Sequence, residues 1–255
     1  METILMIHGM WHGPWCFEKY IAYFQQRGYK CLAPVLRHHD VAPSAPPPPE
    51  AGTVGLQDYA DDLEKIIRGL PEPPIILGHS MGALLAQILA ARGLGKAIVA
   101  LATAQPAGQY FSPWTQIKSF SEPMTTWGFW RKPFKPSFSK AVYSMLSNMP
   151  EEERERHYGR LVHESGRAFA QIAFWSFDSS RGSWVDETKI TQPMLLIGAG
   201  QDRITPVSSV RKVAAKYAKV AEYHEFPEMA HIVLSEPGWE GVAGYVHDWL
   251  KRKGL

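Results

Sequence analysis

The chain has 255 residues, of which 45% are hydrophobic and 20% are charged, and its formal net charge at pH 7 is +2. This length and apolar content suit a folded domain with a large core and exclude a disordered chain. The nearly balanced charge gives no reason to expect nucleic acid as a partner. The longest apolar runs, such as residues 97–102, are far shorter than the roughly 20 residues that span a bilayer.

Apolar runs alternate with amphipathic stretches along most of the chain, which predicts parallel strands joined by helices. The expected strands are 2–8, 30–36, 74–78, 96–102, 194–198 and 222–226. The expected helices are 14–27, 56–69, the stretch after residue 80, 207–219 and one within 238–253. The loop at 41–52, with four prolines at 46–49, is interpreted as a stiff surface connector rather than as a ligand for an SH3-like partner.

The first expected strand begins at once, so we expect no signal peptide and a cytoplasmic location. The cysteines Cys16 and Cys31 fall on an expected helix and an expected strand. We interpret both as buried thiols; a disulfide between them is not needed. The Arg-His-His-Asp run at 37–40 lacks the spacing of a metal site, and we expect no metal and no cofactor.

A glycine-flanked serine follows the third expected strand. Residues 78–82 read Gly-His-Ser-Met-Gly, and a helix is expected directly after them. A serine on so tight a strand-to-helix corner has a strained backbone that projects its hydroxyl from the sheet edge, and the flanking glycines let other chain segments pass close by. The pattern predicts that Ser80 is a nucleophile, although the same five-residue pattern also occurs in unrelated turns.

A nucleophilic serine needs a base and a carboxylate that orients this base. Asp202 follows the strand expected at 194–198, and His231 follows the strand expected at 222–226. Because the carboxyl ends of parallel strands meet at one edge of a sheet, Ser80, Asp202 and His231 are predicted to form a catalytic triad. Asp178 and Asp186 are alternatives for the acid, but neither follows a buried strand.

The order of these residues resembles that of the α/β-hydrolase superfamily, and the resemblance covers the chain from about residue 2 to about residue 250. It implies a mostly parallel sheet flanked by helices, with an inserted helical cap. By position in the motifs, the backbone N–H groups of Met10 and Met81 would form an oxyanion hole. Trp11, next to Met10, and His79, next to Ser80, are taken as substrate-binding residues.

The resemblance places the cap where the alternation of strands and helices is interrupted. We take residues 110–185 as the cap, and residues 1–109 and 186–255 as the core. The cap holds sixteen of the thirty aromatic residues. A helix is expected to start at residue 150, and the apolar stretch 169–177, which includes Trp175, is expected to face a substrate pocket. The plainer alternative is that these rings only pack the cap onto the sheet.

These features predict a serine hydrolase that cleaves carboxylic esters of small to medium apolar or aryl substrates through an acyl-enzyme. Hydrolysis of C–C bonds, lactonase or perhydrolase activity on the same triad, and slow turnover in a small-molecule receptor remain alternatives.

Residues 8–15 resemble those of small esterases related to plant methyl esterases and hydroxynitrile lyases. Such lyases carry a threonine after the first histidine and a lysine after the triad histidine, where this chain has Gly9 and Ile232; cyanohydrin cleavage is therefore not expected. The natural substrate and the oligomeric state are left open.

Overall fold

A parallel sheet of six strands forms the centre of the molecule. The computed structural model describes residues 1–110 and 114–255. The strand order is β2-β1-β3-β4-β7-β8, and all neighbouring strands are parallel. The strand bounds are β1 Thr3–Ile7, β2 Lys30–Leu32, β3 Ile75–His79, β4 Ala97–Leu101, β7 Met194–Ala199 and β8 Ala221–Phe226. The alternation of apolar and amphipathic segments thus predicted the class of fold correctly.

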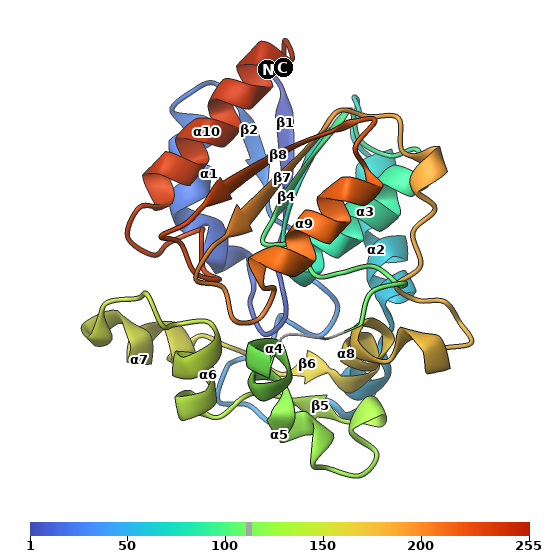
Figure 1. Ribbon diagram of the computed structural model, residues 1–255, viewed down its shortest axis with the longest axis vertical. Helices are drawn as coiled ribbons and strands as arrows, with labels where there is room; N and C mark the ends of the chain where they lie inside the picture. The colour runs from blue at the N-terminus through green and yellow to red at the C-terminus, as the bar shows by residue number, and fades with distance from the viewer. Residues whose placement is uncertain (111–113) are drawn as a thin grey trace.

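Helices cover both faces of this sheet (Figure 1). Helices α1 and α10 pack on one face, and α2, α3 and α9 pack on the other. Their bounds are α1 Glu18–Gln25, α2 Leu56–Arg68, α3 Met81–Ala91, α9 Val207–Lys216 and α10 Trp239–Arg252. Because successive strand residues point to opposite faces, Ile4 and Met6 of β1 enter one core, whereas Leu5 and Ile7 enter the other. The two cores hold the sheet from both sides.

Three expectations about the first part of the chain need correction: two concern secondary structure and one concerns the cysteines. Strand β2 ends at Leu32, because Pro34 has no N–H group with which to extend the strand pairing. The helix expected at 14–27 is divided into a 3-10 turn, Pro14–Phe17, and the shorter α1. The prediction of two buried thiols is wrong for Cys31, which is half-buried because β2 lies at the sheet edge; both cysteines are free.

The inserted segment (residues 114–177) lies at the carboxyl end of the sheet, away from both chain termini (Figure 1). It contains five short helices, a small antiparallel sheet of β5 with β6, and two 3-10 turns. The bounds are α4 Trp114–Ser119, α5 Ser121–Met124, η3 Phe129–Arg131, β5 Pro133–Phe134, α6 Phe138–Ser144, α7 Glu151–Gly159, β6 Glu164–Ser165, α8 Gly166–Ala173 and η4 Trp175–Phe177. The helix expected from residue 150 is α7. The small sheet was not predicted, and residues 111–113 of the predicted cap lie outside the described residues.

Buried polar contacts join the inserted segment to the core. The carboxylate of Glu164 accepts a hydrogen bond from the Tyr59 hydroxyl at 2.8 Å and lies 3.2 Å from Nε2 of His39. Burial opposes a charged imidazole, but the negative charge and hydrogen bond of Glu164 outweigh it and raise the pKa of His39. The N–H of Val162 donates to the carbonyl of Trp11 at 2.8 Å. The run at 37–40 therefore contributes a structural histidine.

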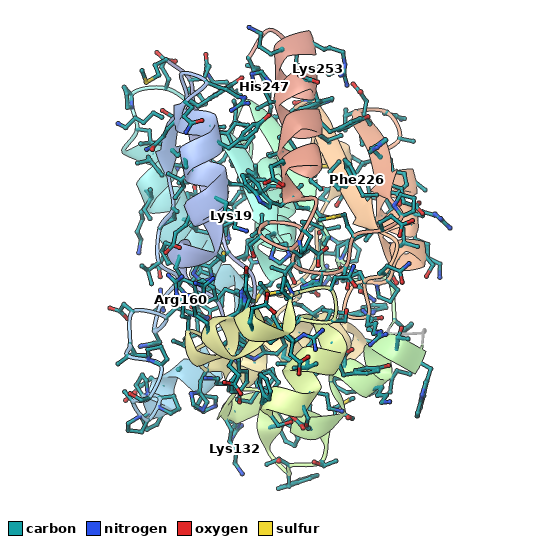
Figure 2. All side chains as sticks on the ribbon, turned by 90° about the vertical axis from the view of Figure 1, so that its left-hand side faces the viewer. Lys19, Lys132, Arg160, Phe226, His247 and Lys253 are labelled. Carbon is teal, nitrogen blue, oxygen red and sulfur yellow. The ribbon has the colours of Figure 1, made fainter. Side chains whose placement is uncertain are left out.

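An exposed ion pair joins the inserted segment to the core on the side of α1. Figure 2 shows Arg160, which follows α7, at the level where the inserted segment meets the core below Lys19. The Arg160 guanidinium pairs with the Glu18 carboxylate at 2.5 Å and lies over the Trp15 ring at 4.4 Å. Because the pair is largely exposed, it contributes at most about 1 kcal/mol. Across residues 1–110 and 114–255, no helix has the length and apolar character needed to cross a membrane.

Helix α3 approaches β1 and β3 so closely that only glycine fits at two positions. A Cβ added at Gly78 would meet the backbone of Gly82 and Ala83. A Cβ added at Gly82 would meet the carbonyl oxygens of Ile7 and His8. Since these contacts are with main-chain atoms, no rotamer change could relieve them. The sequence-based interpretation of the glycines that flank Ser80 is confirmed.

We predict that Gly82→Ala lowers the free energy of unfolding by about 3 kcal/mol or more, because α3 and β1 would have to separate. Gly241→Ala is the matched control. Gly241 lies in α10, and a Cβ there would meet nothing within 4 Å, so alanine should stabilise the helix by up to about 1 kcal/mol. Equilibrium unfolding in urea measures both effects, and similar values for the two variants would contradict this packing.

Candidate active site

The backbone of Ser80 is strained at the corner between β3 and α3. Its φ and ψ angles are 55° and −120°, a combination that costs a non-glycine residue about 1–3 kcal/mol. Neighbouring chain holds this corner in place: the Ser80 N–H donates to the Leu101 carbonyl, and the Ser80 carbonyl accepts from the Ala104 N–H, both at 3.0 Å. The strain is thus maintained by β4 and the turn that follows it, as expected for a nucleophile elbow.

The structure brings Ser80, Asp202 and His231 into one line of contacts. Nδ1 of His231 lies 2.7 Å from Oδ2 of Asp202, and Nε2 of His231 lies 3.1 Å from Oγ of Ser80. All three side chains are buried. An ionised carboxylate can only accept, so the proton belongs on Nδ1 and leaves Nε2 free to accept the serine proton. The alternative acids, Asp178 and Asp186, instead accept hydrogen bonds from residues in their own turns.

Asp202 is held by hydrogen bonds from the chain that follows it. Its Oδ1 accepts from the N–H groups of Ile204 and Thr205 at 2.7 and 2.9 Å, and its Oδ2 accepts from the Thr205 hydroxyl at 2.6 Å. Burial alone would raise the pKa of Asp202, but His231 and these donors outweigh burial and lower it. The carboxylate is therefore ionised at neutral pH. Sequence reasoning missed Thr205. The available signal was Asp202 itself, because an aspartate often accepts a hydrogen bond from the backbone N–H two residues further on.

Two histidines near the site, His79 and His12, bond to backbone carbonyls. Nε2 of His79 donates to the carbonyl of His231 at 2.7 Å, and its ring lies 4.8 Å from the His231 ring. Nδ1 of His12 donates to the carbonyl of Met10 at 2.7 Å, so its Nε2 accepts from Nε2 of His157 at 3.0 Å. His157 belongs to α7. The turn that contains Met10 is thus connected to the inserted segment through a pair of neutral imidazoles.

Burial keeps four histidines around the site uncharged. Burial, reinforced by the neighbouring His39, lowers the pKa of His8 to about 3. Burial and the nearby His231 lower the pKa of His79 to about 3. Burial also lowers the pKa values of His12 and His157 well below the ordinary value. These imidazoles are consequently hydrogen-bonding groups rather than charged ones at neutral pH.

A buried acid lies beside the histidine loop. Oε1 of Glu236 accepts from the N–H of Ala230 at 2.5 Å, while its Oε2 has no hydrogen-bond partner among the described residues. Burial and the charge of Asp202 raise the pKa of Glu236 to about 7, although the Ala230 N–H opposes this shift. Glu236 thus fixes the residue before His231. No sequence motif indicated this contact.

A cavity of about 20 Å³ lies beside the Ser80 hydroxyl. Its walls come from the core and from α4 and α8 of the inserted segment. The residues that line it are Met10, Ser80, Met81, Ala104, Gln105, Gln116, Phe120, Phe169, Ile172, Ile204 and Thr205. Met10 and Met81, the residues expected to stabilise an oxyanion, therefore both border the space next to Ser80. Met81 is the first residue of α3, where N–H groups have no partner within the helix.

The three predicted substrate-binding side chains are not in the wall of this cavity. Trp11 is buried and stacks on Phe120 at a centroid distance of 5.9 Å, so it supports the wall from outside. His79 bonds to the His231 carbonyl. Trp175 donates through Nε1 to the Gln109 carbonyl at 3.1 Å. Of the stretch 169–177, Phe169 and Ile172 face the cavity, whereas Phe177 is exposed.

A larger cavity, of about 210 Å³, lies between α1 and α7 and is lined in part by Arg160. Its lining includes Trp15, Lys19 and His157, but it does not include Ser80, Asp202 or His231. In the part of the chain that the structure describes, no group of three or more histidine, cysteine or acidic side chains could hold a metal ion.

The fold, with Ser80, His231 and Asp202 in contact at the carboxyl end of the sheet, points to a class of protein. The model of the alpha/beta hydrolase family matches residues 4–243, and the chain belongs to this family, which confirms the resemblance seen in the sequence. A probable esterase from rice, PIR7A of Oryza sativa subsp. indica, is 31% identical over 111 residues, which are 42% of this chain and 40% of that protein. The similar stretch therefore covers less than half of the relative.

Solved structures share the fold over nearly the whole chain. The methylesterase MES16 from Arabidopsis superposes with a TM-score of 0.74 at 15% identity, covering 98% of this chain and 99% of that one. A pyrethroid hydrolase from Sphingobium faniae superposes with a TM-score of 0.70 at 16% identity, covering 97% and 96% of the two chains. At these identities the likeness establishes the fold.

We predict a steep loss of stability below pH 6.5. An unfolded histidine binds a proton near this pH, whereas His8, His12, His79 and His157 stay neutral in the folded protein. Lowering the pH therefore favours the unfolded chain. Glu236 acts in the opposite direction, because it keeps a proton in the folded state up to about pH 7. The net difference of about three protons corresponds to about 4 kcal/mol per pH unit.

Urea unfolding at a series of pH values from 8 down to 5 measures this slope. His157→Gln removes one of the four neutral imidazoles and should reduce the slope by about 1.4 kcal/mol per pH unit, whatever its effect on stability at pH 8. A free energy of unfolding that stays constant between pH 7 and pH 5.5 would show that these histidines are not held neutral.

Proposed function

We propose that the protein is a serine esterase that cleaves carboxylic esters through an acyl-enzyme. The observation that carries this proposal is the line of contacts from Asp202 through His231 to a strained Ser80, beside a cavity bordered by Met10 and Met81. Family membership and the match to a probable esterase support it. The names of the structural neighbours, a methylesterase and a pyrethroid hydrolase, agree with chemistry at an ester carbonyl.

In the first half of the reaction, Oγ of Ser80 attacks the ester carbonyl while Nε2 of His231 takes the serine proton. The carbonyl oxygen becomes an oxyanion, which accepts hydrogen bonds from the N–H groups of Met10 and Met81. One such donor contributes roughly 3 kcal/mol to lowering the barrier. Asp202 remains ionised and stabilises the imidazolium. His231 then gives its proton to the leaving alcohol as the C–O bond breaks, and the acyl group stays on Ser80.

In the second half, His231 removes a proton from a water that attacks the acyl-enzyme carbonyl. A second oxyanion forms at the same two N–H groups. When it collapses, the bond to Ser80 Oγ breaks, Oγ recovers its proton from His231, and a carboxylic acid leaves. The inserted segment acts as the cap in this proposal, with residues 110–185 as its extent, because α4 and α8 form part of the cavity wall beside Ser80 and would reduce the access of bulk water.

The cavity favours substrates with a short acyl group. Its volume of about 20 Å³ is only slightly above the roughly 10–15 Å³ that a single water needs. Long acyl chains would require the inserted segment to move away. Small carbonyl compounds other than open-chain esters, such as lactones, fit the same steps.

A second candidate is a small-molecule receptor that turns over slowly. The small cavity and the buried Ser80 favour it, because such a site gives a bound ligand little room to exchange. The two candidates differ in the number of turnovers. An esterase would release many equivalents of product, whereas a receptor would stop after one or a few.

A panel of p-nitrophenyl esters from acetate to laurate, with an aryl ester and a lactone, tests the proposal. We expect many turnovers on acetate and butyrate and a steep fall toward laurate. Ser80→Ala should lower kcat by at least about a thousandfold, and Asp202→Asn by roughly 10⁴-fold because His231 would adopt the wrong tautomer. Full turnover by Ser80→Ala would rule out the mechanism, and product release that stops near one equivalent would favour the receptor.

A further inference from the structure

Two buried glutamines beside Ser80 have hydrogen-bonding groups without partners among the residues that the structure describes. Gln105, in the turn after β4, and Gln116, on α4, are each 1% exposed and both line the cavity. Nε2 of Gln105 and Oε1 of Gln116 are buried and have no hydrogen-bond partner among residues 1–110 and 114–255. A buried polar group without a hydrogen bond costs free energy, so the presence of two such groups in the wall points to a ligand that satisfies them.

The orientation of both amides is fixed by a neighbouring carbonyl. Nε2 of Gln116 donates to the carbonyl of Ile204 at 2.9 Å, and a carbonyl oxygen can only accept, so the nitrogen and oxygen of Gln116 cannot be exchanged. The same Nε2 lies 2.9 Å from Oε1 of Gln105, which must therefore be the oxygen. The unpaired groups are thus an N–H₂ donor on Gln105 and a carbonyl acceptor on Gln116.

We propose that Gln105 and Gln116 bind a hydroxyl group on the acyl part of the substrate. A hydroxyl accepts from Gln105 and donates to Gln116, and it is small enough for the cavity of about 20 Å³. A primary amide or carboxylic acid offers the same pairing but is larger. The acyl part is the one that remains bound to Ser80 in both halves of the reaction, and the cavity borders Ser80, Met10 and Met81. This inference rests on the proposed esterase activity.

The cavity also has room for one water in the free protein. A water satisfies the same donor and acceptor, so a substrate hydroxyl can take its place without loss of hydrogen bonds. A methyl group in that place would displace the water and leave both amides unpaired. The protein should therefore discriminate between a hydroxyacyl ester and the alkyl ester of the same shape, as sites built around buried polar groups do.

The test compares p-nitrophenyl hydroxyacetate with p-nitrophenyl propionate, in which a methyl replaces the hydroxyl. A second pair is 3-hydroxypropionate with butyrate. Each kcat/KM is divided by the rate constant for hydrolysis of the same ester by hydroxide, which removes the intrinsic effect of the hydroxyl on the carbonyl. We expect the normalised value to favour the hydroxy ester by about tenfold or more in at least one pair.

Gln105→Met removes the donor at similar side-chain length and should bring the preference down to about one. Gln171→Met is the control: Gln171 is a buried glutamine of α8, its amide is paired with Leu56 and Ser180, and it does not line the cavity. This variant should keep the preference.

If the ratio of normalised kcat/KM values is near one for both ester pairs in the wild-type protein, the hydroxyl site is overturned. This outcome does not depend on whether any variant folds. A preference that persists in Gln105→Met would overturn it as well. Hydrolysis that depends on Ser80 in either case would leave the esterase proposal intact, whereas hydrolysis that survives Ser80→Ala would refute the esterase proposal itself.

Discussion

The close approach of α3 to the ends of β1 and β3 sets the geometry of the candidate site. At Gly82 the helix backbone lies against the carbonyl groups that end β1, where any side chain would collide. This contact brings the strained corner at Ser80 next to the turn that contains Met10, so that Met10 and Met81 border the same small cavity. If the helix were displaced, the hydroxyl and the two proposed oxyanion donors would no longer face one point. A positive φ at Ser80 is the local cost of that arrangement.

The inserted segment completes the site through polar contacts as well as through aromatic packing. His157 on α7 bonds to His12, which in turn bonds to the carbonyl of Met10, so that movement of α7 and the position of the Met10 turn are linked. Glu164 is buried against His39 and Tyr59 on the core side. Neutral imidazoles suit the role of His12 and His157, because they can donate and accept without placing a charge in a dry interior. We therefore expect acid, which protonates these imidazoles, to weaken the contact between the inserted segment and the core.

The parallel core was predictable from the sequence because strand ends and hydrophobic periodicity are local properties. Ser80, Asp202 and His231 could be chosen because each follows an apolar run, and the structure places the three side chains in contact. Their catalytic roles stay proposals. Element ends were less predictable: strand β2 stops before Pro34. Its position at the sheet edge leaves Cys31 half-buried.

The cavity wall could not be predicted, because no periodic pattern shows which residues of an irregular segment face inward. Its position next to Met10 drew attention to Trp11, and the aromatic content of the predicted cap drew attention to Trp175. Both pack outside the wall, whereas Gln116 on a six-residue helix lies within it. Only the three-dimensional arrangement shows that Gln105 and Gln116, in the cavity that Ser80 also lines, leave a donor and an acceptor unpaired among the described residues. That pair of glutamines changes the expected substrate from a purely apolar ester to one that carries a hydroxyl group.

The most direct test of the central claim is detection of the acyl-enzyme. The protein is mixed with p-nitrophenyl acetate, quenched in acid within milliseconds to seconds, and analysed by intact-mass and peptide mass spectrometry. The mechanism predicts a transient mass increase of one acetyl group on the peptide that contains Ser80, formed as fast as p-nitrophenol is released and absent in Ser80→Ala. Turnover with no covalent adduct, or an adduct on another residue formed at the rate of turnover, would contradict the account.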